Sequence, residues 1–138
     1  MSYDTNNVFA KILRGEIPSF KVHEDEHTLC FMDIMPQVDG HALVIPKQPA
    51  ETLFELSDDS AQACMRTVRQ VGEAMKKALG VEGIVLMQLN GTAAGQTVPH
   101  FHIHVIPGSI ADLRKPHATA MGDMDKIKGL AERIKAAL

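Results

Sequence analysis

The chain has 138 residues, of which 45% are hydrophobic and 22% charged, and its formal net charge is -3. This length fits one domain, residues 1–138, that can bury a core without disulfides or a structural metal. A negative net charge disfavours general binding to nucleic acids, because that binding depends on cations that neutralise phosphates. The apolar runs are too short to cross a bilayer, so we expect no membrane partner. Cys30 and Cys64 lack C-x-x-C spacing, so we expect both to be core thiols. The start of the chain resembles no export signal, so we expect a cytoplasmic protein.

The first third of the chain predicts a short helix followed by three strands. Apolar residues recur at helical spacing over residues 7–14, and Gly15 follows where a helix cap is common. Two β-favouring runs, residues 20–25 and 28–34, are joined by acidic residues and predict a hairpin. A compact apolar run over residues 41–47, ended by a proline, predicts the third strand.

The rest of the chain predicts two further strands and two further helices. Residues 57–79 begin with Ser-Asp-Asp and carry an apolar stripe, which predicts the main helix. Residues 83–90 predict a buried strand, and a loop of small residues leads from it to a last strand over residues 101–107. An amphipathic pattern over residues 123–138 predicts a closing helix. Short links between strands indicate an α+β fold with an antiparallel sheet of about five strands.

Three histidines occupy alternate positions in the run VPHFHIHVIPG, residues 98–108. If the segment is a strand, His100, His102 and His104 share one face, while the apolar residues between them pack inward. Side chains two residues apart along a strand lie roughly 6.5 to 7 Å apart, so we expect a row of rings that do not touch. One histidine alone would most often be structural. Three in register favour either a metal site or phosphoryl chemistry.

The loop before the histidines favours phosphoryl chemistry. Residues 90–97 supply glycines, an amide and hydroxyl groups, which suit the approach of backbone N–H groups to an anion. Such a loop alone is also typical of an ordinary turn. A mononuclear metal site needs ligands about 2 Å from one ion, and rings spread along a strand converge only in favourable rotamers. A neutral imidazole, in contrast, can attack phosphorus and form a covalent phosphohistidine without any metal.

The run HFHIHVI resembles the signature of the histidine triad (HIT) family of nucleotide hydrolases and transferases. The similarity extends over residues 9–47 and 90–108. It implies a HIT-like fold and cleavage at the α-phosphate of purine nucleoside phosphoramidates or dinucleoside polyphosphates. The implied intermediate is a nucleotidyl-histidine, which water converts to a nucleoside monophosphate. The resemblance also implies a homodimer paired through the main helix and a central strand.

The resemblance implies a role for each matching residue. His102 would be the nucleophile, His100 and His104 would orient it and bind phosphate oxygens, and His41 would be a further active-site histidine. Asp33 would bind the ribose hydroxyls. The remaining implied nucleotide contacts are Asn90, Gly95, Gln96 and Thr97 at the phosphate and leaving group, and Val8, Phe9, Ile12, Phe31 and Ile34 around the base. A strand-entry histidine, a turn-capping aspartate and a plain apolar core are the structural alternatives at these positions.

Two departures from the family pattern concern metal and leaving group. Zinc-bearing members carry C-x-x-C where this chain reads Asn7 to Ala10, and a usual histidine is replaced around Gln48-Pro49. We therefore expect no structural zinc and no cofactor. Some phosphoramidase members have a tryptophan-containing C-terminus, whereas this chain has Lys115-Pro116-His117, which leaves the leaving-group preference open.

Two other function classes remain open alternatives. One is a nucleotide-binding adaptor in which hydrolysis is incidental, and the other is a histidine metal-binding protein. Apolar residues that could contribute to a dimer interface, but are more often ordinary core, are Met65, Val68, Met75 and Met87.

Overall fold

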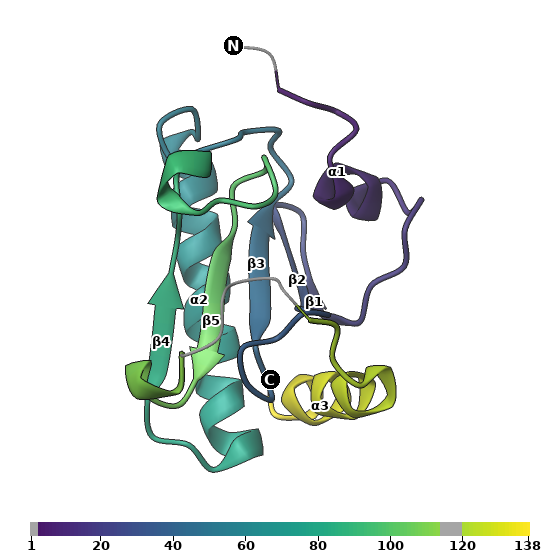
Figure 1. The fold of residues 1–138 in the computed structure, drawn as a ribbon, viewed down its shortest axis with the longest axis vertical. Helices are drawn as coiled ribbons and strands as arrows, with labels where there is room; N and C mark the ends of the chain where they lie inside the picture. Colours follow the sequence, from purple (N-terminus) through teal and green to yellow (C-terminus); the bar gives the residue numbers. More distant parts are fainter. Residues whose placement is uncertain (1–2, 114–119) are drawn as a thin grey trace.

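The computed structural model describes residues 3–113 and 120–138, and the Lys115-Pro116-His117 segment lies outside them. An antiparallel sheet has the order β1-β2-β3-β5-β4, which confirms the predicted α+β class (Figure 1). The strands are β1 (Lys21–Glu24), β2 (Thr28–Met32), β3 (Ala42–Pro46), β4 (Ile84–Met87) and β5 (Ile103–Pro107). The α-helices are α1 (Val8–Leu13), α2 (Asp58–Leu79) and α3 (Met124–Ala136). No helix in the described ranges is long and apolar enough to cross a membrane.

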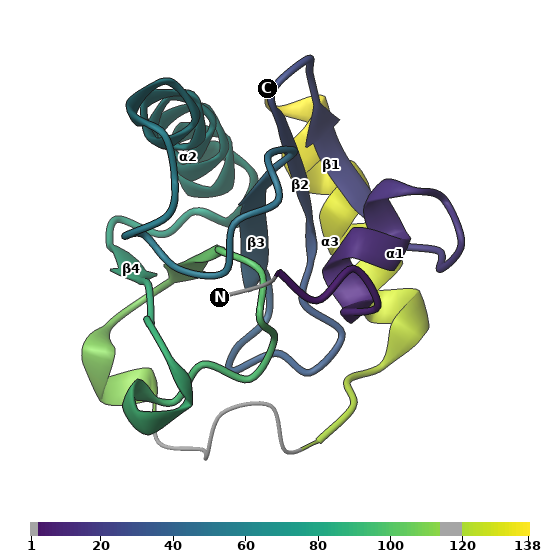
Figure 2. The same ribbon diagram turned by 90° about the horizontal axis from the view of Figure 1, so that it is seen from above.

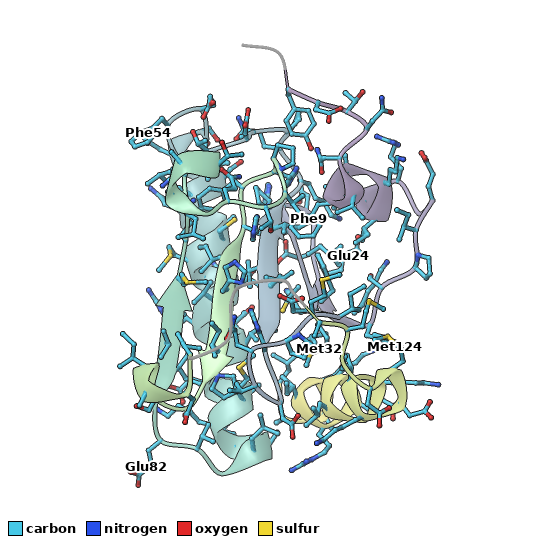
Figure 3. The ribbon with its side chains drawn as sticks, viewed as in Figure 1. Phe9, Glu24, Met32, Phe54, Glu82 and Met124 are labelled. Carbon is cyan, nitrogen blue, oxygen red and sulfur yellow. The ribbon has the colours of Figure 1, made fainter. Side chains whose placement is uncertain are left out.

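The sheet separates two apolar clusters. Cys30 and Val44 point from the central strands into the larger cluster, which α2 and α3 cover. Leu29 and Leu43 point the opposite way, into a smaller cluster that includes Phe9 of α1. Figure 2 shows α1 and α2 on opposite sides of β2 and β3, and Figure 3 places Phe9 between α1 and the sheet. The alternation of side chains along each strand therefore supplies two different faces, one for the main core and one for α1.

The helix ends follow the signals in the sequence. The side chain of Asn7 accepts a hydrogen bond from the Ala10 N–H at 2.9 Å, and Ser57 accepts one from the Ser60 N–H at 3.1 Å. These side chains satisfy backbone donors that the first helical turn leaves without a partner. Gly80 ends α2 with a φ of 66°, a left-handed conformation that favours glycine.

The prediction of a buried strand over residues 83–90 is wrong in two respects. The strand β4 covers only Ile84–Met87, and Leu86 is 47% exposed. The reason is that β4 is an edge strand, since it pairs with β5 alone. An apolar run with turn signals on both sides does not distinguish a central strand from an edge strand.

The histidine strand begins later than expected. Pairing of β5 with β3 starts at Ile103, opposite Val44, so only His104 lies within the regular strand. Pro99 has no N–H group to donate, and the N–H of Phe101 bonds to the carbonyl of Ala50 at 2.8 Å, outside the sheet ladder.

The cysteines are buried and free, which confirms that they are core thiols. The four candidate interface residues fall into two groups. Val68 and Met75 are buried in the larger cluster, whereas Met65 is 47% exposed and Met87 is half-buried.

Candidate active site

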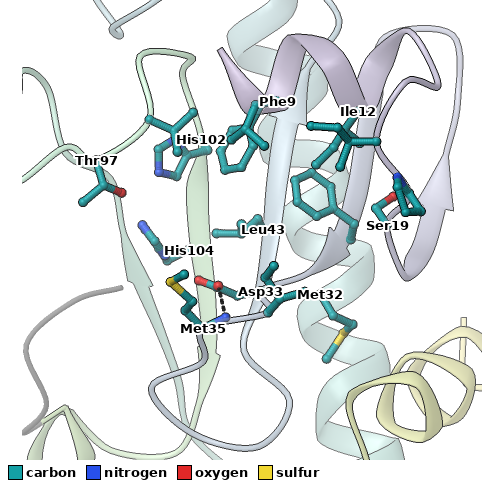
Figure 4. A pocket seen from close by; sticks show the side chains of 16 residues that line it. Phe9, Ile12, Ser19, Met32, Asp33, Met35, Leu43, Thr97, His102 and His104 are labelled. Atoms are coloured by element: carbon teal, nitrogen blue, oxygen red, sulfur yellow. Dashed lines mark hydrogen bonds between the residues drawn. The ribbon is translucent and has the colours of Figure 1, made fainter. Parts of the chain in front are cut away.

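A cavity of about 240 Å³ lies between α1, the central strands and the segment before β5 (Figure 4). Its walls are mainly apolar, with a carboxylate and two imidazoles among them. Nine residues predicted for the site line it: Val8, Phe9, Ile12, Phe31, Asp33, Ile34, Thr97, His102 and His104. The structure therefore brings together segments from both halves of the chain at one cavity.

Five predicted residues lie outside this lining, and seven lining residues were not predicted. The five are His41, Asn90, Gly95, Gln96 and His100. The seven are Ile17, Pro18, Ser19, Met32, Met35, Leu43 and Val98. Leu43 could have been found, because it is two residues from His41 and shares its face of the strand. The segment 17–19 carried no comparable signal, since irregular chain between a helix and a strand has no periodicity to follow.

His102 has a defined tautomer. Its Nδ1 lies 2.6 Å from the backbone carbonyl oxygen of His100, so Nδ1 carries the proton and donates it. In the neutral ring, Nε2 then holds the lone pair that attack on phosphorus requires. The ring packs edge-on against Phe9 at a centroid distance of 5.0 Å. A backbone acceptor and an aromatic neighbour thus fix both the tautomer and the orientation of this histidine.

His104 receives its proton arrangement from His41. The backbone N–H of Gln37 donates to His41 Nδ1 at 3.0 Å, which places the proton of a neutral His41 on Nε2. That Nε2 donates to His104 Nδ1 at 2.8 Å, so His104 carries its own proton on Nε2. Asp33 Oδ2 lies 3.4 Å from His41 Nε2, and Asp33 Oδ1 accepts from the Met35 N–H at 2.8 Å. His41 is fully buried and therefore acts on the cavity through its neighbours.

The rings are closer than the strand geometry predicted. The ring centroids of His102 and His104 are 5.0 Å apart, in an edge-to-face arrangement, so they touch. The prediction of a separated row is wrong here, because His102 precedes the regular strand and the two residues do not follow ideal strand spacing. A phosphate placed at these two rings could contact both.

His100 is not among the residues that line the cavity. Its Nε2 donates to the Pro46 carbonyl at 2.9 Å, and its Nδ1 accepts from the Tyr3 hydroxyl at 2.5 Å. Burial lowers the pKa of His100 to about 4, and the neighbouring His102 adds to the decrease. His100 is therefore neutral at physiological pH and is bonded at both ring nitrogens.

The loop before the histidines uses much of its polar character internally. Gln96 is 5% exposed, accepts from the Gly91 N–H, and donates to the carbonyls of Glu51 and Val98. Asn90 accepts from the Leu53 N–H at 2.8 Å and exchanges hydrogen bonds with Gln88. Gly95 closes the short 3-10 turn Thr92–Ala94 with a φ of 105°. Thr97, two residues after Gly95, lines the cavity. The phosphate contacts predicted for Asn90, Gly95 and Gln96 stay predictions.

One group of side chains has the composition of a metal site. Within the described ranges, Asp33, His41 and His104 offer ligand atoms that all lie within 4.8 Å of one another. An ion here would need lone pairs on the facing nitrogens of the two histidines. The Gln37 N–H instead keeps a proton on His41 Nε2, where it bonds to His104. The hydrogen bonds therefore favour a fixed proton arrangement over ligation of a metal.

Solved structures of similar chains carry the same fold. A Hit-like protein from Bartonella henselae, described as involved in cell-cycle regulation and crystallised with an unknown ligand, matches with a TM-score of 0.91 and 39% identity over all of both chains. A Zn-bound histidine triad family protein from Mycobacterium smegmatis matches with a TM-score of 0.82 and 29% identity. That match covers 96% of this chain and 93% of the other.

The residues at the position of the C-x-x-C pair do not fit a zinc ion. Asn7 uses its side-chain oxygen to cap α1 and its amide to bond Tyr3, and Ala10 has no ligand atom. Both thiols lie in the larger core cluster instead, where burial raises the pKa of Cys64 to about 12. Zinc prefers thiolate and imidazole ligands, so this set of groups offers it no site.

The sequence comparisons agree with the structural ones. The protein-family model described as the HIT domain matches residues 14–110 of this chain. The adenosine 5'-monophosphoramidase hnt1 of Schizosaccharomyces pombe is 44% identical over 100 residues, which cover 72% of this chain and 72% of that protein. Together with the sheet, the cavity and the histidines, these matches show that the chain belongs to the HIT family.

Proposed function

We propose that the protein is a nucleotide hydrolase that cleaves at the α-phosphate of purine nucleoside phosphoramidates or dinucleoside polyphosphates. One observation carries the proposal above all others. His102 lies on the wall of the cavity with its proton held on Nδ1 by the His100 carbonyl, so that Nε2 is the nucleophilic nitrogen. Family members named as phosphoramidases give independent support for this reaction class.

The cavity suits a nucleotide in three parts. Phe9, Ile12 and Phe31 give an apolar wall for the base, since ligand pockets of this kind are mostly apolar with a few placed polar groups. The Asp33 carboxylate can accept hydrogen bonds from both ribose hydroxyls. His102 and His104 then meet the α-phosphate.

The reaction proceeds in two steps. Nε2 of His102 forms a bond to the α-phosphorus while the bond to the leaving group breaks, and the leaving group departs with the electron pair and takes a proton from solvent. The positive charge that develops on His102 is stabilised by the hydrogen bond from Nδ1–H to the His100 carbonyl. The Nε2–H of His104 can donate to a non-bridging oxygen. Water then attacks phosphorus and loses one proton to solvent, the P–N bond breaks with its electron pair returning to Nε2 of His102, and the nucleoside monophosphate leaves.

Substitution His102→Asn tests this proposal. The variant removes the nucleophilic nitrogen, so turnover of adenosine 5'-phosphoramidate should fall at least roughly 1000-fold. Binding of AMP, measured by calorimetry, should remain within a few-fold of wild type. His27→Asn is the matched control, because His27 is exposed on the β1–β2 hairpin. Unchanged turnover in His102→Asn would refute the mechanism, and tight AMP binding by a wild-type protein without turnover would favour the nucleotide-binding adaptor.

The homodimer and the cytoplasmic location expected from the sequence stay predictions.

A further inference from the structure

A chain of hydrogen bonds links the start of the described chain to the histidine segment. The Asn7 side-chain amide donates to the Tyr3 hydroxyl at 2.8 Å, and the Tyr3 hydroxyl contacts His100 Nδ1 at 2.5 Å. His100 Nε2 contacts the Pro46 carbonyl at 2.9 Å. Tyr3 also packs edge-on against the His100 ring, with a centroid distance of 5.6 Å. None of these residues except His100 belongs to the site predicted from the sequence.

The direction of each hydrogen bond in this series follows from the atoms that it joins. The Asn7 oxygen accepts from the Ala10 N–H, so its amide nitrogen must face Tyr3. A side-chain amide nitrogen only donates, so the Tyr3 oxygen accepts from Asn7 and directs its own proton to His100 Nδ1. The Pro46 carbonyl only accepts, so His100 carries its proton on Nε2. The neutral state and tautomer of His100 are therefore set from both sides.

The hydrogen-bonded ring of His100 holds in place the backbone carbonyl that orients the nucleophilic ring of His102. The His100 carbonyl accepts the Nδ1–H of His102 at 2.6 Å, and Phe9 packs against the rings of both histidines. A shift of the His100 ring would move this carbonyl, because both belong to one residue. The geometry of His102 therefore depends on a contact that begins at Tyr3.

We infer that Tyr3 and Asn7 are positioning residues, which fix His100 and through its carbonyl the nucleophilic ring of His102. The inference rests on the function proposed above. It makes the segment before α1 part of the catalytic apparatus, although the cavity lining does not include Tyr3 or Asn7.

Two substitutions separate positioning from folding. Tyr3→Phe keeps the aromatic ring and removes only the hydroxyl. Asn7→Asp keeps an oxygen that can cap α1 but replaces the donor to Tyr3 with an acceptor, which draws the tyrosine proton away from His100. Asn6→Ala is the matched control, since Asn6 is exposed and precedes Asn7 directly. Circular dichroism and thermal unfolding report whether each variant is folded.

Kinetics and nitrogen NMR give the readouts. We expect kcat for adenosine 5'-phosphoramidate to fall roughly tenfold in Tyr3→Phe and at least as much in Asn7→Asp, because the nucleophilic ring is then held less precisely in its attacking geometry. Neither change alters the cavity, so the Kd of AMP should stay within about twofold, and Asn6→Ala should behave as wild type. The ¹⁵N signals of His100 and His102 should shift in both variants, reporting changed hydrogen bonding at each ring.

The outcomes distinguish this inference from the proposed function. Folded variants with wild-type kcat and unchanged His102 signals would overturn the role of Tyr3 and Asn7. If the wild-type protein turns over no nucleotide conjugate, the proposed function fails, and the His102 signals alone then decide the inference. Unchanged His102 signals in that case refute the positioning, and shifted signals support it.

Discussion

The histidine segment and the loop before it were both predicted to contact phosphate, yet their polar groups are used differently. His102 and His104 line the cavity, with protons fixed by neighbours behind them. Gln96 and Asn90 bond chiefly to backbone and side chains of their own surroundings. A residue type shows which chemistry is possible, whereas the partners that its atoms already have decide which of that chemistry reaches a ligand.

His100 belongs to the histidine segment but resembles the loop residues in this respect. Both of its ring nitrogens are bonded within the protein, and its contribution to the site passes through its backbone carbonyl. The three histidines therefore include both kinds of residue: His102 and His104 line the cavity, whereas His100 is bonded within the protein.

Among the changes that test this comparison, substitution of His41 should cause the largest loss of activity. His41→Leu removes the donor to His104 and leaves the Gln37 N–H without its acceptor, so we expect kcat to fall about 100-fold. His41→Gln can restore an acceptor and a donor and should recover part of the activity. Steady-state kinetics with adenosine 5'-phosphoramidate measures both. Equal activity of the two variants would show that the hydrogen bonds do not set the state of His104.

A pair of neighbouring substitutions separates the loop from the cavity. Gln96→Ala removes three hydrogen bonds from a buried side chain and should lower the free energy of unfolding by about 2 to 3 kcal/mol. Thr97→Ala should change that free energy by less than about 0.5 kcal/mol and raise KM several-fold, because Thr97 lines the cavity. Urea unfolding and kinetics check both. A stable Gln96→Ala variant with weakened substrate binding would place Gln96 among the ligand contacts.

The effect of pH on stability should be smaller than the effect of Gln96→Ala, and it should come from His100. Its pKa falls from 6.5 to about 4 on folding, so the unfolded chain binds the proton more readily between these values. The free energy of unfolding should therefore fall by about 2 kcal/mol between pH 7 and pH 5 through this group, and fall no further below its folded pKa. Urea unfolding of His100→Gln should show a smaller decrease. The same decrease in wild type and variant would assign the effect to other groups.

Much of the fold followed from local patterns in the sequence. Apolar periodicity located the described α-helices to within a few residues, and Ser57 marked the start of α2. The edge position of β4 was not predictable, because it depends on strand order and not on the strand's own residues. Pro99 is a local signal for the late start of β5, but the bond between the Phe101 N–H and the Ala50 carbonyl is long-range and no local pattern contains it.

The resemblance to the HIT family pointed to His102 and Asp33, and both line the cavity. The contact between Tyr3 and His100 was not predictable, since these residues are 97 positions apart in the chain and meet only after folding. The same holds for the segment 17–19, which reaches the cavity by the path of an irregular loop.

Intact-mass spectrometry of the protein, denatured at neutral pH during turnover of adenosine 5'-phosphoramidate, tests the covalent role of His102 most directly. The wild-type protein should gain the mass of one adenylyl group, and peptide mapping should place it on His102. The His102→Asn variant should gain nothing. An adduct on another residue would contradict the mechanism. Turnover by the wild-type protein would also contradict it if samples quenched rapidly during the reaction carried no adduct.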